Sequence, residues 1–266
     1  VGGHDALAGG KCGRDERMCR LQATHALDDE LDLGIADDVI VACRHARIAQ
    51  TVRQLEDAGD VHALDALGDN APLIEGRRAL DAGASTGGFT DVLLRRGASS
   101  VVAVDVGYGQ LAWKLQSDPR VEVHDRTNVR TLDPAAVAPA PELVVGDMSF
   151  ISLTLVLPAL VAAAAPHADF LLMVKPQFEI GKDRLGHGGV VRNPEHHVET
   201  VEKVARCAIN LGLDIAAIAA SPLPGPSGNV EYFVHMRRDY PDPIDASELT
   251  DYIRAAVAAG PAGGHS

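Results

Sequence analysis

The fold of this chain is decided by one stretch, Leu80-Asp81-Ala82-Gly83-Ala84-Ser85-Thr86-Gly87-Gly88-Phe89-Thr90. An apolar strand end is followed by an acid, then by small residues, and then by the start of a helix that we expect over 89–96. Small residues let a backbone approach a ligand closely, and glycine adopts positive φ without a Cβ clash. The N–H groups and the dipole of the helix point at whatever lies in the crevice. The stretch therefore predicts a turn that holds a nucleotide-like cofactor.

A second acid supports this prediction. Asp105 ends the next expected strand, 22 residues after Gly83, where a carboxylate can hydrogen-bond ribose hydroxyls. The dinucleotide fingerprint G-x-G-x-x-G does not fit, because Ser85 stands where that motif needs its second glycine. The pattern D-x-G-x-x-x-G-G-F-T is closer to the S-adenosylmethionine loop of class I methyltransferases. An ordinary tight turn between a strand and a helix is the alternative interpretation.

Composition limits the class of protein. With 266 residues and 46% hydrophobic content, the chain can hold one large α/β domain with an appendage, or two domains. A net charge of −13 argues against a general attraction to nucleic acid, so any RNA contact must come from a local basic surface. The four cysteines lack C-x-x-C spacing, which favours reduced thiols in a cytoplasmic protein. We find no signal-peptide pattern, and the most apolar stretch, 151–165, is shorter than the ~20 residues of a spanning helix.

The chain divides into two unlike parts. Residues 1–72 carry 7 basic and 14 acidic residues and show weak periodicity, so we interpret them as an atypical, poorly ordered N-terminal segment. Within it, 1–13 is expected to be disordered, and short helices are expected over 31–41 and 48–55. Residues 73–260 form the predicted catalytic domain, and 261–266 form a disordered tail.

From residue 73 onward, short apolar runs alternate with amphipathic ones. Asn193 and Pro194 begin one helix and Gly212 ends it, and a last helix is expected to start near Asp245 with Glu248 completing a capping box. Strands are expected over 79–81, 100–106, 121–125, 143–147, 170–175, 213–220 and 230–236, and helices over 89–96, 110–116 and 153–165. Five parallel strands and a late antiparallel hairpin predict a seven-stranded, mostly parallel Rossmann-like α/β sheet, the class I S-adenosylmethionine-dependent methyltransferase fold.

Charged residues lie at the ends of five expected strands. Because carboxyl ends of parallel strands share one edge of a sheet, these side chains should gather there: Asp81, Asp105, Asp125, Asp147 and Lys175. Glu231 opens the last strand and should join them. Asp147, Lys175 and Glu231 together suit the deprotonation of a hydroxyl, in which a lysine acts as base only when neutral. Two alternatives remain open, namely that Lys175 is only an ion-pair partner and that Glu231 is an exposed strand residue.

Two loops are expected to carry function. The glycine-rich loop 181–192 is long for a compact domain, and its Lys182, Arg184 and Arg192 could hold phosphates, although an ordinary solvated loop is the alternative. Loop 221–229 is stiffened by three prolines and could wall a site. His196 and His197 are adjacent, so they face different sides of a helix and are expected to be solvated. We predict no metal site.

Six segments in order resemble one family. They are 80–90, 105–111, 125–128, 147–152, 174–179 and 224–231, and together they resemble the TlyA family of FtsJ-like RNA 2′-O-methyltransferases, also called hemolysin A, over about 73–237. The resemblance implies methyl transfer from S-adenosylmethionine to a cytidine 2′-hydroxyl in ribosomal RNA, with ribosomal subunits as partners. It also implies cofactor contacts through Asp81, Gly83, Ser85, Thr86, Gly87, Gly88, Phe89, Asp105, Asn128 and Asp147.

The resemblance has two departures. The family's catalytic tetrad is Lys-Asp-Lys-Glu, and Asp147, Lys175 and Glu231 match its last three members. The first lysine should fall around 59–62, yet no lysine lies between Lys11 and Lys114. The family also begins with a basic S4-type RNA-binding domain that residues 1–72 do not resemble. One hypothesis is that residues 1–68 come from a misread frame or a wrong start.

Three functions follow from these observations. The first is an RNA ribose methyltransferase. The second is a membrane-acting hemolysin, against which the missing apolar span counts. The third is a cofactor-binding protein that has lost catalysis, because one tetrad member is missing.

Overall fold

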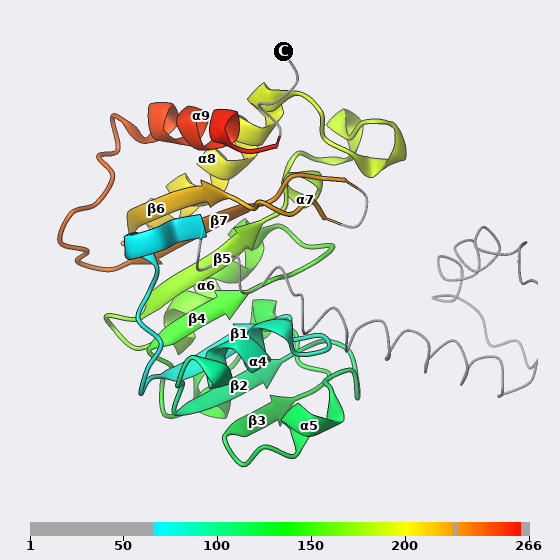
Figure 1. Ribbon diagram of the computed structural model, residues 1–266, viewed down its shortest axis with the longest axis vertical. Coiled ribbons are helices and arrows are strands. Elements are labelled where there is room, and N and C mark those ends of the chain that lie inside the picture. The colour runs from blue at the N-terminus through cyan, green and yellow to red at the C-terminus, as the bar shows by residue number, and fades with distance from the viewer. Residues whose placement is uncertain (1–65, 226–227, 262–266) are drawn as a thin grey trace, which may run out of the picture. The chain divides into compact units, whose positions relative to one another are not determined.

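A seven-stranded sheet organises the part of the chain that the structure describes. The computed structural model describes residues 66–225 and 228–261 (Figure 1). The helices expected over 31–41 and 48–55, the disorder expected over 1–13 and most of the predicted tail lie outside these residues. The domain boundary after residue 72 stays a prediction.

The strand order confirms the predicted sheet. The strands are β1 (Arg78–Ala82), β2 (Ser100–Val104), β3 (Val121–His124), β4 (Leu143–Gly146), β5 (Asp169–Val174), β6 (Asp214–Ala220) and β7 (Tyr232–Arg237). They lie in the order β3-β2-β1-β4-β5-β7-β6. Only β7 runs antiparallel to its two neighbours, β5 and β6. The chain reverses its direction of strand addition between β1 and β4, and ligands bind at such a switch point.

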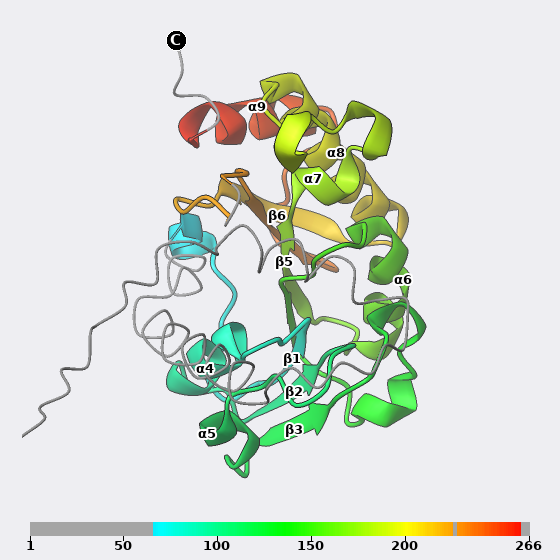
Figure 2. The ribbon, with the colours of Figure 1, turned by 90° about the vertical axis from the view of Figure 1, so that its right-hand side faces the viewer.

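Helices cover both faces of the sheet (Figure 2). They are α4 (Gly88–Arg95), α5 (Trp113–Gln116), α6 (Leu153–Ala163), α7 (Pro176–Glu179), α8 (Pro194–Asn210) and α9 (Leu249–Ala259), and short 3-10 turns are η1 (Gly68–Asn70), η2 (Val129–Thr131), η3 (Pro134–Val137), η4 (Lys182–Arg184) and η5 (His187–Gly189). Figure 2 shows α4 and α6 on opposite sides of the sheet.

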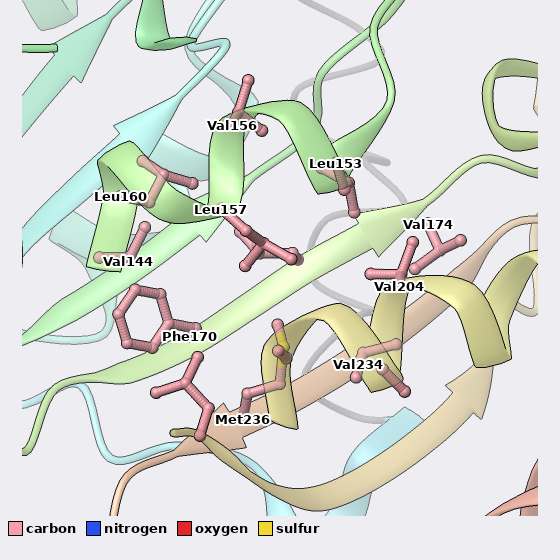
Figure 3. Close-up of a cluster of buried hydrophobic side chains, with 14 of the residues drawn as sticks. Val144, Leu153, Val156, Leu157, Leu160, Phe170, Val174, Val204, Val234 and Met236 are labelled. Atoms are coloured by element: carbon pink, nitrogen blue, oxygen red, sulfur yellow. The ribbon is translucent and has the colours of Figure 1, made fainter. Parts of the chain in front are cut away.

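The core has two parts because both faces of the central strands are covered. Along β1, Ala79 packs into the cluster with α4, whereas Leu80 packs into the cluster with α6 and α8. Figure 3 shows this second cluster, in which Leu157, Phe170 and Val204 come together from α6, β5 and α8. The central strands are therefore apolar on both faces, as the continuous hydrophobic runs predicted. The edge strand β3 differs, since two of its four residues are exposed.

Several predicted boundaries are wrong, among them the end of β2 and the start of the last helix. Strand β2 ends at Val104, so Val106 lies in a loop and is exposed. The last helix begins at Leu249 instead of near Asp245. Asp245 accepts hydrogen bonds from the N–H and the hydroxyl of Ser247 and so closes a separate turn, while Glu248 makes no capping contact. The spacing of Asp245 and Glu248 resembles a capping box, but Asp245 bonds to a residue two positions later and forms a turn instead of a helix start.

Candidate active site

Two adjoining cavities open at the carboxyl edge of the sheet. The smaller, about 440 Å³, lies beside the turn after β1, and the larger, about 810 Å³, lies beyond β5. Ser149, Phe150 and Ile151 line both of them. The segment after β4 therefore separates two chambers, one of which borders the glycine turn.

The glycine turn is shaped by close backbone approach. Gly83 has φ +83°, and a Cβ placed there would lie 2.8 Å from the carbonyl oxygen of Asp147. Gly87 precedes α4 with φ +100°, and a Cβ there would collide with Leu115 of α5. The first glycine thus brings the ends of β1 and β4 together, and the second lets α5 pack on the start of α4.

The predicted cofactor residues divide into two groups. Five line the smaller cavity, namely Gly83, Ser85, Asp105, Asn128 and Asp147. The others do not line it and shape the turn instead. Asp81 is 1% exposed and accepts a 2.6 Å hydrogen bond from the hydroxyl of Thr90, Phe89 lies in the core, and the carbonyl of Thr86 accepts from Ala112. Gly87 precedes α4 and Gly88 is its first residue.

Asp105 organises the wall of the smaller cavity. One carboxylate oxygen accepts from the Ser85 N–H at 2.8 Å, and the other accepts from the Gly107 N–H at 2.7 Å. Each oxygen keeps a second lone pair for a further donor. The side-chain oxygen of Asn128 accepts from the Arg130 N–H at 3.0 Å and so starts the turn η2.

Asp147, Lys175 and Glu231 come together from three distant places in the chain. Asp147 follows β4, Lys175 follows β5, and Glu231 precedes β7. The Lys175 ammonium forms an ion pair with Asp147, and its Nζ lies 3.8 Å from Glu231 Oε1 and donates to Ser149 Oγ at 3.3 Å. Asp147 lines the smaller cavity, whereas Lys175 and Glu231 line the larger one. The ion pair therefore bridges the two chambers.

Glu231 is held in a buried, crowded position. Its side chain is 8% exposed, and a Cβ on Gly225 would come within 2.9 Å of its Oε1. Burial raises the pKa of Glu231, the nearby Asp147 carboxylate raises it further, and Lys175 and the Gln177 amide oppose the shift. This position excludes the alternative that Glu231 is an exposed strand residue.

An aromatic pair that sequence reasoning missed lines the larger cavity, and one of its members, Phe150, also lines the smaller one. Phe150 has φ +65° and is 91% exposed, and its ring centroid lies 5.1 Å from that of Phe178. Positive φ is uncommon for a bulky residue and marks a strained position. An aromatic residue in the segment after β4 could have been noticed in the sequence, but nothing in the sequence revealed its exposure or its backbone conformation.

The three basic residues of the glycine-rich loop have different surroundings. Lys182 lines the larger cavity. Arg184 forms a bidentate ion pair with Glu199, with both contacts at 2.6 Å. Arg192 is exposed and does not line either cavity. Their contact with RNA phosphates stays a prediction.

The prediction that both adjacent histidines are solvated is wrong for His197. This side chain is 1% exposed, and burial lowers its pKa. It lies between the carbonyl of Val191 and the hydroxyl of Tyr232. In the described ranges, no cluster of three or more histidine, cysteine or acidic side chains could hold a metal ion.

Comparisons with known proteins identify the family. A sequence model of the FtsJ-like methyltransferase family matches residues 61–238. The 16S/23S rRNA (cytidine-2′-O)-methyltransferase TlyA of Mycobacterium tuberculosis H37Rv is 55% identical over 201 residues, or 76% of this chain and 74% of that protein. A solved candidate hemolysin from Lactococcus lactis is 39% identical, with a TM-score of 0.68 over 74% of this chain and 95% of that one. An S-adenosylmethionine dependent methyltransferase from Mesorhizobium loti shares the fold at 15% identity, with a TM-score of 0.51 over 69% and 100%. The predicted resemblance is confirmed, and the chain belongs to the FtsJ-like methyltransferase family.

Proposed function

We propose that this protein transfers a methyl group from S-adenosylmethionine to the 2′-hydroxyl of a cytidine in ribosomal RNA. One observation carries the proposal, namely the Lys175 ammonium held between Asp147 and Glu231 where the two chambers meet. S-adenosylmethionine is the cofactor that membership of the family implies, and a relative 55% identical to this chain carries the name of an rRNA cytidine-2′-O-methyltransferase.

The smaller cavity suits this cofactor. Gly83 lines the cavity, so the amino-acid group of the cofactor can lie close to its backbone. Asp105 has acceptor capacity left for ribose hydroxyls. We assign cofactor contacts to the five residues that line the cavity, namely Gly83, Ser85, Asp105, Asn128 and Asp147. Asp81, Thr86, Gly87, Gly88 and Phe89 support them by fixing the turn.

The larger cavity is assigned to the RNA ribose. The bound cofactor supplies an electrophilic methyl group on a sulfonium sulfur. The attacking hydroxyl must lose its proton, and Lys175 Nζ is placed to take it when the amine is neutral. Asp147 and Glu231 fix the position of Nζ, which lowers the entropic cost of alignment. Lys182 lines the same cavity and is assigned a contact with an RNA phosphate.

We also propose a domain organisation and a cellular location for the chain. We assign residues 73–260 to the catalytic domain, with 1–72 as a separate segment and 261–266 as a tail. We expect the protein to act in the cytoplasm, where ribosomal RNA is made. In the part of the chain that the structure describes, we find no helix with the length and apolar character needed to cross a bilayer.

Methyl transfer to ribosomal subunits tests the proposal. The purified full chain is incubated with each isolated ribosomal subunit and labelled S-adenosylmethionine, and the modified ribose is mapped. We expect label on a cytidine 2′-oxygen. Asp147→Ala should abolish transfer while the circular dichroism spectrum stays that of the folded protein, because Lys175 loses its closest carboxylate. Asp133→Ala, which removes an exposed carboxylate at the start of η3, is the control and should retain transfer.

Two other results would overturn the proposal. Wild-type rates in Asp147→Ala would remove the assigned role of the cluster. Tight cofactor binding without transfer to either subunit would favour a cofactor-binding protein that has lost catalysis. The absence of the first lysine of the family's tetrad is the reason to test this alternative.

A further inference from the structure

The glycine-rich loop 181–192 forms one wall of the larger cavity, and its C-terminal end is tied to the loop before β7. Asn229 is 3% exposed and also lines this cavity. Its Oδ1 accepts from the Val191 N–H at 3.0 Å, and its Nδ2 donates to the Gly189 carbonyl at 3.0 Å. The two backbone partners fix the orientation of the amide, since one is a donor and the other an acceptor. One side chain thus bonds to two backbone groups of the other loop, which lie 38 and 40 residues before it in the chain.

The carbonyl of Val191 is held from a second side. His197 Nε2 lies 3.0 Å from this oxygen, and the Tyr232 hydroxyl lies 3.1 Å from His197 Nδ1. Because a carbonyl only accepts, Nε2 carries the proton and Nδ1 accepts from the tyrosine. Val191 is therefore fixed at its N–H by Asn229 and at its C=O, through His197, by Tyr232.

These anchors flank Glu231. Asn229 lies two residues before it and Tyr232 one residue after it. The backbone of Asn229 also accepts from the Gly225 N–H at 2.8 Å, and Gly225 approaches Glu231 closely. Asn229 and Val191 do not line the smaller cavity. The hydrogen bonds of Asn229 therefore connect loop 181–192 to the segment that carries Glu231, and they lie outside the smaller cavity.

We propose that Asn229 is a positioning residue, which holds loop 181–192 in the shape that admits the RNA beside Glu231. This inference rests on the proposed function only in naming RNA as the occupant. A buried amide is suited to the task because a backbone N–H and C=O left without partners are costly. Loss of the two Asn229 hydrogen bonds should let Gly189 and Val191 move, and this should displace the part of loop 181–192 that carries Lys182.

The test compares isosteric and truncated variants of the full chain. In Asn229→Asp the side chain keeps its size but presents an oxygen to the Gly189 carbonyl, and in Asn229→Ala both hydrogen bonds are lost. Asn210→Asp and Asn210→Ala are the matched controls, since Asn210 is exposed at the last turn of α8. The measurements are KM and kcat with ribosomal subunits, the Kd of the same subunits by filter retention, the Kd of S-adenosylmethionine by calorimetry, and amide hydrogen exchange of Val191.

We expect KM and Kd for the subunits to rise by roughly tenfold or more in both Asn229 variants, as small displacements of positioning groups do. The cofactor Kd should stay within about twofold and the Val191 amide should exchange faster, because it loses its acceptor. The Asn210 variants should match the wild type.

Two outcomes would overturn the inference. The first is faster exchange at Val191 with unchanged KM and Kd for the subunits. The second is an equal loss of cofactor and RNA binding, which would indicate general unfolding. If the wild type methylates no subunit, the proposed function fails, while subunit binding and Val191 exchange still decide the role of Asn229.

Discussion

At the scale of single residues, Gly83 shows how a backbone conformation sets a site. The turn after β1 needs both positive φ and the absence of a Cβ at this position, because the Asp147 carbonyl lies where the Cβ would be. Asp147 in turn forms the ion pair with Lys175. The glycine therefore sets the distance between the cofactor turn and the proposed catalytic cluster.

Gly83→Ala should weaken cofactor binding. An alanine at this φ costs about 1–2 kcal/mol, and its methyl group would push on the Asp147 carbonyl at 2.8 Å. We expect the Kd of S-adenosylmethionine, measured by calorimetry, to rise by about tenfold or more, equivalent to roughly 1.4 kcal/mol.

Gly76→Ala is the control that separates the effect of backbone strain from the effect of a steric clash with Asp147. Gly76 has φ +76°, but nothing lies within 4 Å of a Cβ placed there. This variant should lose stability through the same backbone strain and keep the wild-type cofactor Kd. Equal cofactor affinity in the two variants would show that the close approach at Gly83 has no role in the site.

At the scale of elements, a buried carboxylate joins the two helices that follow β4 and β5. Glu179, the last residue of α7, is 5% exposed. It accepts from the Leu153 N–H and the Ser152 hydroxyl, both at 2.6 Å, and from Lys203 Nζ at 3.1 Å. A carboxylate at a helix N-terminus satisfies unpaired N–H groups and the helix dipole. Glu179 thus caps α6 from outside its own sequence.

Glu179→Ala should destabilise the fold by about 2 kcal/mol, the upper end for the loss of a helix cap, because the N–H of Leu153 is left buried without its acceptor. Urea unfolding at pH 7 measures this loss. Glu248→Ala is the control, since Glu248 precedes α9 without a capping contact and should change stability by less than about 0.5 kcal/mol. Equal midpoints for the two variants would contradict the assigned cap.

Sequence patterns predicted the presence of strands and helices more accurately than the residues at which they begin and end. The strand runs and the helix begun by Asn193 and Pro194 are found where expected, because burial on both sheet faces and a side-chain cap are local properties. The start of α9 is wrong because Asp245 satisfied its acceptor within a turn. Helix α5 begins at Trp113, three residues later than expected.

At the scale of the whole molecule, Asp169 ties distant segments together at the edge opposite the site. It starts β5 and is 2% exposed. Its carboxylate accepts from His235 Nε2 of β7 at 2.8 Å and forms an ion pair with Arg77 before β1. His235 Nδ1 lies 2.7 Å from the carbonyl of Asn70. Burial alone would raise the pKa of Asp169, but hydrogen bonds from His235 and Arg77 outweigh it and hold the pKa below its ordinary 3.8.

Asp169→Asn should destabilise the protein by about 3–5 kcal/mol at pH 7, since it removes one partner of a buried ion pair. A carboxyl group whose pKa is lowered by folding stabilises above its unfolded value and loses this effect as pH falls through the folded value. The part of the stability difference that comes from the Asp169 carboxylate should therefore be full above its unfolded pKa and shrink below about pH 3.8.

Chemical denaturation across this pH range measures the difference. Asp251→Asn, at an exposed position of α9, is the control and should follow the wild type. A stability difference that stays constant down to pH 2 would show that ionisation of Asp169 does not contribute to the fold.

The candidate site was predictable in part. The acids and the lysine that follow β2, β4 and β5 could be placed at one edge because parallel strands end together. The sequence did not distinguish Asp81, which is buried against Thr90, from Asp105, which lines the cavity. It did not reveal that Arg184 is paired with Glu199, or that Phe150 lies exposed between two chambers. These outcomes depend on side-chain direction and on partners far along the chain.

By itself, the sequence determined the fold class, the family and the strand ends that carry charge, because periodicity, small-residue turns and ordered motifs are written in consecutive residues. Only the tertiary structure decided which of those charges meet, where the two cavities lie, and that Asn229 anchors Val191. Such contacts join residues tens of positions apart, and their geometry follows from the packing of whole elements, which no local pattern encodes.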